Sequence, residues 1–151
     1  MLGIDGLSLT QSLAIVEYLD ETRGLNLLPG SAGDRARIRA IAHAIAMEIH
    51  PVCNLRVARY AVAQSNGGIT MESWMRDMIS PGLRAVEEMV DHGNHCFGAG
   101  ITLADICLVP QLYNARRWGV DLTTTPRLTR IGADLESLPA FAAAHPDLAP
   151  H

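Results

Sequence analysis

Residues 97–111 read FGAGITLADICLVPQ, and this stretch says most about the fold. Thr102 and Asp105 stand three residues apart just after a glycine-rich loop, so that each side chain can bond the other's unpaired backbone N–H group. This pattern predicts the start of a helix. The helix continues through Ile106, Val109 and Leu112 and is apolar on nearly every side, which is typical of a helix at the buried centre of a bundle.

Further helical patterns lie on both sides of this central helix. Apolar residues recur at helical spacing over residues 34–63, which predicts one long helix. A second long helix is predicted over residues 70–91, and the short loop between the two favours antiparallel packing. Its predicted buried stripe comprises Met71, Trp74, Met78, Val86 and Met89. With one more helix near residues 126–138, abundant alanine and only 5% aromatic residues, we expect an all-α fold.

The first 31 residues follow a different pattern. Residues 1–5 predict a short strand, with Asp5-Gly6 as the turn that follows it. Residues 9–22 predict a helix with Thr10 as its N-cap. The Pro29-Gly30 pair beyond it indicates a linker, so we expect two units, residues 1–28 and residues 29–151.

Pro51 interrupts the long helix predicted over residues 34–63. A proline inside a helix removes one backbone donor and clashes with the preceding turn, so we expect a bend near Met47 to His50. Such a bend suits a functional cleft, and it equally suits a core helix that is simply kinked.

Composition and charge exclude several classes of function. The formal net charge is −4 and the arginines are scattered, which argues against binding to nucleic acid. The longest apolar stretch, residues 40–49, is far shorter than the roughly 20 residues of a membrane-spanning helix. The N-terminus has no pattern of a secretory signal. Three cysteines without CxxC spacing suit reduced thiols, so we expect a cytoplasmic protein.

Four stretches, in this order and at this spacing, resemble the zeta-class glutathione transferases: residues 9–22 (LTQSLAIVEYLDET), 49–57 (IHPVCNLRV), 97–111 and 114–123 (NARRWGVDLT). The resemblance covers essentially the whole chain. It implies the helical C-terminal domain of that family, preceded by one strand and one helix of its thioredoxin-like domain. It also implies a homodimer with glutathione as cofactor. The catalytic hydroxyl or thiol is expected in a segment upstream of residue 1, so we expect no catalytic residue in this chain and no activity from it alone.

The resemblance also implies a reaction. It is the glutathione-dependent cis–trans isomerisation of a maleyl keto-acid, either maleylacetoacetate to fumarylacetoacetate or maleylpyruvate to fumarylpyruvate. The corresponding pathways are phenylalanine and tyrosine catabolism and gentisate catabolism. Two other interpretations stay open: a non-catalytic helical binding or assembly module, and a general transferase that conjugates glutathione to electrophiles.

Gln11 and Ser12 are the first candidate ligands of glutathione. They fall in the first turn of the first helix, where unpaired N–H groups and the positive end of the helix dipole attract an anion. The resemblance implies that this pair holds the γ-glutamyl carboxylate. Spacing alone also suits a pair that only caps the helix.

A second candidate group straddles the predicted bend and comprises His50, Asn54, Leu55 and Arg56. Residues four apart on a helix are neighbours, so His50 and Asn54 can face one ligand. The resemblance implies that this group lines the seam between glutathione and the second substrate, whereas a lone histidine on an apolar helix is more often a core residue. His43 and His50 are two turns apart and form no metal motif, so we expect no metal.

Arg56 and Arg117 are the candidate substrate ligands. A maleyl-type acid is a planar anion, and an arginine can hold its carboxylates through paired hydrogen bonds. A surface ion pair is the simpler role for each. Arg116 and Arg117 are adjacent and point about a quarter-turn apart on a helix, and the resemblance favours Arg117. We expect Cys53 and Cys96 to be structural, because neither has a base nearby in the pattern.

Overall fold

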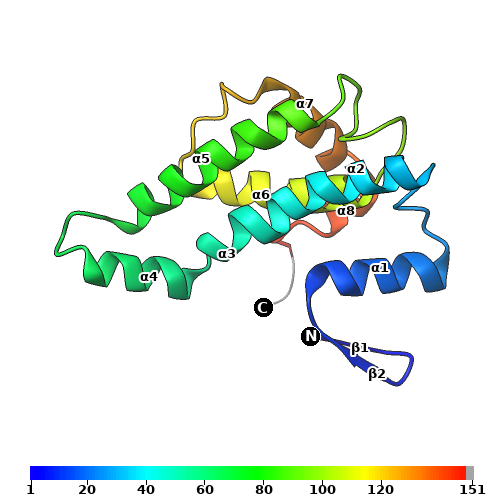
Figure 1. The fold of residues 1–151 in the computed structure, drawn as a ribbon, viewed down its shortest axis with the longest axis horizontal. Helices are drawn as coiled ribbons and strands as arrows, with labels where there is room; N and C mark the ends of the chain where they lie inside the picture. Colours follow the sequence, from blue (N-terminus) through cyan, green and yellow to red (C-terminus); the bar gives the residue numbers. More distant parts are fainter. Residues whose placement is uncertain (149–151) are drawn as a thin grey trace.

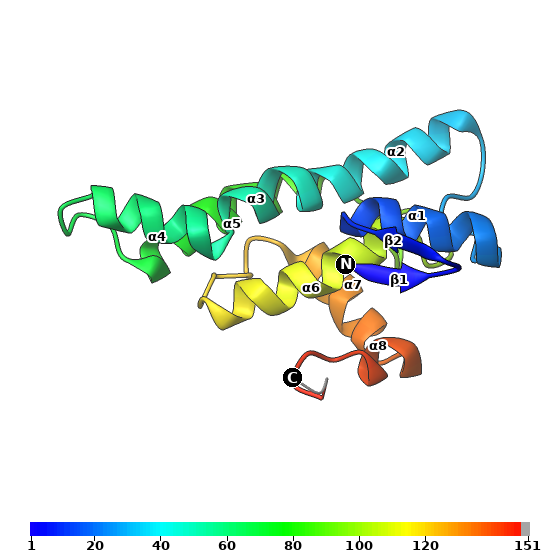
Figure 2. The same cartoon turned by 90° about the horizontal axis from the view of Figure 1, so that it is seen from below.

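The computed structural model describes residues 1–148, and it is a bundle of helices with a small hairpin at the N-terminal end (Figures 1 and 2). In chain order the helices are α1 (Ser12–Arg23), α2 (Ala32–His43), the π-helical segment η1 (Ala44–Ile49), α3 (His50–Val52), α4 (Leu55–Gln64), α5 (Met71–Met89), α6 (Leu103–Arg117), α7 (Pro126–Glu136) and α8 (Pro139–Ala143). The predicted helical architecture is confirmed. The last three residues of the second predicted unit, 149–151, lie outside the described residues.

The N-terminal segment differs from the prediction of a single strand. Strands β1 (Leu2–Ile4) and β2 (Leu7–Leu9) form an antiparallel hairpin. Asp5 and Gly6 form its two-residue loop with φ of 52° and 75°, the positive values that a tight hairpin turn requires. The Asp5 carboxylate also accepts hydrogen bonds from Tyr18 and Arg23 and thereby ties the hairpin to α1.

Helix α6 lies at the centre of the bundle, as predicted. Its buried face packs against α2, η1, α5 and α7. The predicted capping box is present: the Thr102 backbone N–H and hydroxyl both donate to the Asp105 carboxylate, at 2.8 and 2.7 Å. Asp105 is fully buried and also accepts a hydrogen bond from the backbone N–H of Cys96. One carboxylate therefore joins the start of α6 to the loop before it.

The long helix predicted over residues 34–63 is broken. Helix α2 runs into the π-helical segment η1, and α3 ends at Val52. Pro51 is the physical cause, because it lacks an N–H group and its ring would clash with the carbonyl of Met47 in an ordinary α-helix. The wider π turn before Pro51 relieves that clash, and the His50 N–H bonds to the carbonyl of Ile45. Asn54 then has extended backbone and begins α4 as a new helix.

The buried face of α5 also differs from the predicted stripe. Met75, Ile79, Leu83 and Val86 are buried, whereas four of the five predicted residues, Met71, Trp74, Met78 and Met89, are only partly buried against the core. The shift arises because α5 packs on η1, α4, α6 and α7, and these contacts select the face. Among the described residues, no helix combines the length and apolar character needed to cross a membrane.

Candidate functional site

A cavity of about 430 Å³ lies where the start of α1 meets α2 and η1. Both ribbon views show α1 running alongside the helical column formed by α2 and η1 (Figures 1 and 2). The cavity is lined by Gln11, Ser12, Leu13 and Ala14 from the start of α1, and by His43, Ala46 and Met47 from the column. The predicted ligands Gln11 and Ser12 therefore share one cavity, and the other wall comes from the segment that Pro51 distorts.

The start of α1 has no side-chain cap. Thr10 was predicted as the N-cap, and this was wrong: Gln11 occupies that position with φ 69° and ψ 116°, and its side chain makes no capping hydrogen bond. The first helical bond is from the N–H of Ile15 to the Gln11 carbonyl, which leaves the N–H groups of Ser12, Leu13 and Ala14 without a partner in residues 1–148. Free N–H groups at the positive end of a helix dipole form an anion site, and a strained non-glycine residue is often found at such sites.

His50 lies at the seam between η1 and α6. It is half-buried, and burial lowers its pKa below the ordinary 6.5, so that the neutral imidazole is favoured. The side-chain amide of Gln111, on α6, lies nearby and raises the pKa of His50, which opposes the effect of burial. The pair nevertheless falls short of hydrogen-bond geometry, since neither polar atom of the Gln111 side chain has a partner in the described residues.

The other members of the predicted seam lie at the start of α4. Helix α3 ends at Val52 and Asn54 caps α4, so the single helix assumed to carry both His50 and Asn54 is wrong, and their approach to one ligand stays a prediction. The Asn54 side chain instead caps α4, and its oxygen accepts a hydrogen bond from the Arg56 N–H at 2.9 Å. Leu55 and the Arg56 side chain are exposed. Their predicted roles in binding stay predictions.

The two arginines at the end of α6 face different surroundings. Arg116 forms an ion pair with Glu136 of α7. Arg117 makes no ion pair within residues 1–148, and its guanidinium lies 5.8 Å from the centre of the Trp118 ring. The positive charge of Arg117 also acts on Tyr113, one helical turn earlier. Of the two arginines, Arg117 is thus the one available to a ligand.

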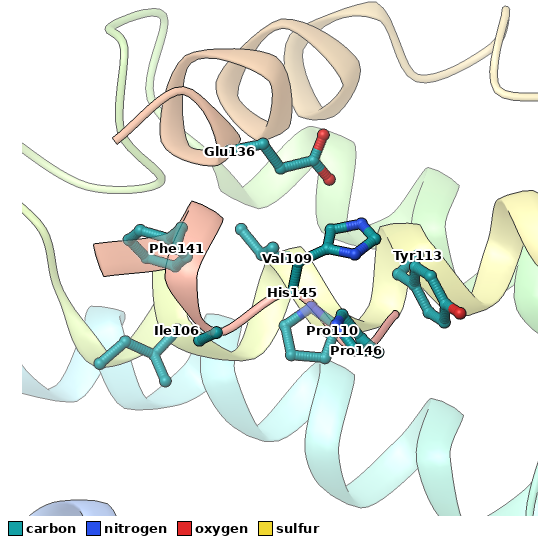
Figure 3. Close-up of a pocket in the computed structure, with 9 residues that line it drawn as sticks. Ile106, Val109, Pro110, Tyr113, Glu136, Phe141, His145 and Pro146 are labelled. Atoms are coloured by element: carbon teal, nitrogen blue, oxygen red, sulfur yellow. The ribbon is translucent and has the colours of Figure 1, made fainter. Parts of the chain in front are cut away.

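A second, more enclosed pocket of about 210 Å³ lies between α6 and residues 136–146. Figure 3 shows its lining, which is mostly apolar and comprises Ile106, Val109, Pro110, Tyr113, Glu136, Phe141, Ala144, His145 and Pro146. The Tyr113 hydroxyl donates to Asp147 at 2.7 Å, and its ring meets the His145 ring edge-on, with centres 5.6 Å apart. These contacts hold the segment after α8 against α6.

The cysteines are poor nucleophiles. Burial raises the pKa of Cys53 and of Cys107 to about 11, and burial together with the nearby Asp105 carboxylate raises the pKa of Cys96 further. All three thiols are free in the structure. Within the described part of the chain, no group of three His, Cys, Asp or Glu side chains is arranged to hold a metal ion.

Sequence reasoning missed several residues of these sites, among them His43, Met47 and Gln111. His43 and Met47 line the α1 cavity, and Gln111 is a buried polar residue in the central helix. A glutamine inside an otherwise apolar stretch was a visible signal for Gln111. His43 and Met47 line a cavity that arises only where α1 approaches η1, and helical spacing carries no sign of that contact.

The sequence and structure are similar to those of known isomerases. The family model described as "Glutathione S-transferase, C-terminal domain" matches residues 35–149. A maleylacetoacetate isomerase of Rhizobium meliloti strain 1021 is 52% identical, and the alignment covers 99% of this chain and 72% of that protein. A crystal structure of the maleylacetoacetate isomerase of Anaeromyxobacter dehalogenans 2CP-1, with glutathione bound in its active site, has a TM-score of 0.89 and 41% identity over 97% of this chain and 69% of that one.

Two more solved structures bear on the ligands. The same Anaeromyxobacter enzyme has also been solved with dicarboxyethyl glutathione and citrate in its active site. A holo structure of maleyl pyruvate isomerase, a bacterial glutathione transferase in the zeta class, has a TM-score of 0.87 and 37% identity over 94% of this chain and 70% of that one. By these identities and coverages, the chain belongs to the zeta-class glutathione transferases, the enzyme family of the maleylacetoacetate and maleylpyruvate isomerases.

Proposed function

We propose that the protein isomerises a maleyl keto-acid, such as maleylpyruvate or maleylacetoacetate, with glutathione as cofactor. The observation that carries the proposal is the uncapped start of α1, which opens into a cavity of about 430 Å³ beside the distorted segment η1. Unpaired N–H groups there fit an anionic group such as a carboxylate of glutathione. The relatives solved with glutathione or a glutathione conjugate in the active site support the same assignment.

Glutathione supplies the chemistry: its thiolate adds to the cis double bond, rotation follows about the resulting single bond, and its elimination leaves the trans product. The protein orients the two reactants, which replaces a bimolecular encounter by a reaction between bound groups. In this proposal the Ser12 and Gln11 region holds the γ-glutamyl carboxylate. His50, Asn54, Leu55 and Arg56 line the side of the cleft toward the second substrate.

Arg117 holds a carboxylate of the maleyl substrate in this proposal. Its guanidinium has no carboxylate partner in the described residues, whereas Arg116 beside it is already paired with Glu136. Arg56 is the second candidate, since it is exposed at the start of α4. The citrate bound in the Anaeromyxobacter enzyme is consistent with a carboxylate subsite in this family.

The residue that activates the thiol is not assigned. The raised pKa values of Cys53 and Cys107 leave both thiols protonated near neutral pH, and Cys96 is more strongly affected. We propose that this group lies upstream of residue 1. We also propose that residues 1–28 belong to a thioredoxin-like unit, that the protein is a cytoplasmic homodimer, and that it serves phenylalanine and tyrosine or gentisate catabolism.

The experiment that tests the function compares Arg117→Ala with Arg116→Ala in protein that turns over maleylpyruvate. Charge-assisted hydrogen bonds are worth about 1.5–3 kcal/mol, so Arg117→Ala should lower kcat/KM for maleylpyruvate by roughly 10- to 150-fold. Arg116→Ala is the matched control and should change it much less. Equal losses in the two variants would contradict the assignment of Arg117.

General conjugation of glutathione to electrophiles is the second candidate function. The apolar pocket beside Tyr113 favours it, because a mostly apolar lining suits a hydrophobic electrophile. The same variants separate the two functions. A conjugating transferase should retain its activity on a halogenated aromatic substrate when Arg117 is replaced by alanine. The unmodified protein should then show no glutathione-dependent isomerisation of maleylpyruvate.

A further inference from the structure

Gln111 is a polar residue on the buried face of α6, the central helix of the bundle. Its exposed fraction is 0%, and both its side-chain oxygen and its side-chain nitrogen lack a partner in residues 1–148. Buried polar groups in folded proteins are nearly always hydrogen-bonded, so an unpaired amide at this depth calls for an explanation. An apolar side chain of similar volume would pack in α6 without that cost.

The neighbour that explains the amide is His50. Helix α6 packs against η1, and His50 follows directly after η1. The Gln111 amide lies within range to affect the His50 imidazole but misses hydrogen-bond geometry. The terminal torsion of a glutamine side chain is soft, so a small rotation completes the hydrogen bond without moving either helix.

A glutamine suits this task for a chemical reason. Burial keeps His50 neutral, and a neutral imidazole has one N–H donor and one acceptor nitrogen. An amide can accept from the first or donate to the second, and the nitrogen it engages fixes which one faces away. His50 lies four residues beyond Ala46 and three beyond Met47, the last two residues of the helical column that line the α1 cavity.

We propose that Gln111 is a positioning residue, which holds the His50 imidazole in one orientation and one tautomer beside the buried face of α6. Its importance for glutathione binding rests on the proposed function, but its effect on His50 does not. In this arrangement Gln111 touches no ligand and acts only through His50.

The test is nitrogen NMR of protein labelled at its histidines, without any ligand. His50→Gln identifies the His50 signals, and His43, His92 and His95 serve as internal references. In the unmodified protein, His50 should show one dominant tautomer. Gln111→Leu should convert it to the mixture typical of an unconstrained histidine. Leu112→Met is the matched control: it is the next buried residue on α6, it faces Gly132 of α7, and it should leave the His50 signals unchanged.

A second variant keeps the test decisive if Gln111→Leu does not fold. Gln111→Glu preserves the size of the side chain and places a carboxylate against the imidazole, which should raise the pKa of His50 by about one pH unit or more. Unchanged His50 signals in Gln111→Glu and in any folded Gln111→Leu would overturn the proposal.

The proposed function is tested separately in the same spectra. Protein that turns over maleylpyruvate should show a shift of the His50 signals when glutathione is added. If glutathione leaves them unchanged while the Gln111 variants alter them, the glutathione site is wrong and the positioning role of Gln111 stands.

Discussion

The close contact between α5 and the end of η1 leads to a sharp prediction about Gly82. A Cβ atom at this position would lie 2.5 Å from Cγ1 and 2.8 Å from Cδ1 of Ile49, the residue before His50. Ile49 is buried and its β-branched side chain is stiff, so it has little freedom to move away. Gly82→Ala should therefore overpack this contact and displace the wall of the candidate site.

The magnitude follows from two opposing effects. An alanine in a helix is favoured over glycine by about 0.5–1 kcal/mol, whereas overpacking a core contact costs about 1–3 kcal/mol. The expected net loss in the free energy of unfolding is about 1 kcal/mol, or roughly 2–4 °C in Tm for a chain of this size. Gly33→Ala is the control, because Gly33 is an exposed helical glycine in α2 where a Cβ would meet nothing closer than 3.6 Å.

The assay is urea denaturation of both variants, followed by far-UV circular dichroism. Gly82 lies in the interior of α5 and Gly33 in the first turn of α2, so alanine gains more helix propensity at Gly82, and the difference between the variants is a lower bound on the packing cost of about 1–3 kcal/mol. Gly82→Ala should also shift the NMR signals of His50, and Gly33→Ala should not. Equal stabilisation by both variants would refute the claim that a Cβ at Gly82 overpacks against Ile49.

Three more predictions concern buried polar and titratable side chains. Asp105→Ala leaves the buried N–H groups of Thr102 and Cys96 unpaired and should lower the free energy of unfolding by about 3 kcal/mol. Thr102→Ala should lower it by about 1 kcal/mol. If urea denaturation gave the reverse order, the result would count against the capping box. Because the thiol pKa values are raised, Ellman's reagent at pH 8 should label the native protein slowly and all three cysteines rapidly in urea, and rapid labelling of native Cys53 would contradict this. Burial lowers the pKa of His50 in the folded state, so its contribution to stability is present above pH 6.5 and is lost as the pH falls below that value. The free energy of unfolding should therefore drop more between pH 7 and pH 5 in the unmodified protein than in His50→Gln. Parallel pH curves for the two proteins would argue against burial of the imidazole.

Local signals in the sequence predicted the parts of the fold that depend on neighbouring residues. The Thr102–Asp105 capping box is such a case, because its two partners are three residues apart. The Asp5-Gly6 turn was also visible, but the three-residue strand after it was too short to produce a pattern. Pro51 predicted a distortion near Met47 to His50, and η1 lies there, but its π form and the new helix start at Asn54 were missed because apolar spacing continues through Pro51.

The candidate site was predicted in part for the same reason. Gln11 and Ser12 were found from their place at a helix start, and they do line a cavity. His43 and Met47 were missed because they reach the cavity only through tertiary contact. The role of Gln111 depends on its burial against His50, and a sequence shows neither the burial of one side chain nor its distance from a residue 61 positions away.

The most direct test of the account is glutathione-dependent isomerisation of maleylpyruvate. It should be measured with this chain and with a version extended upstream of residue 1, each with and without glutathione. The account predicts turnover by the extended protein only when glutathione is present, and little or none by the 151-residue chain. Absence of turnover from an extended protein that is folded would contradict the account and favour a non-catalytic helical module.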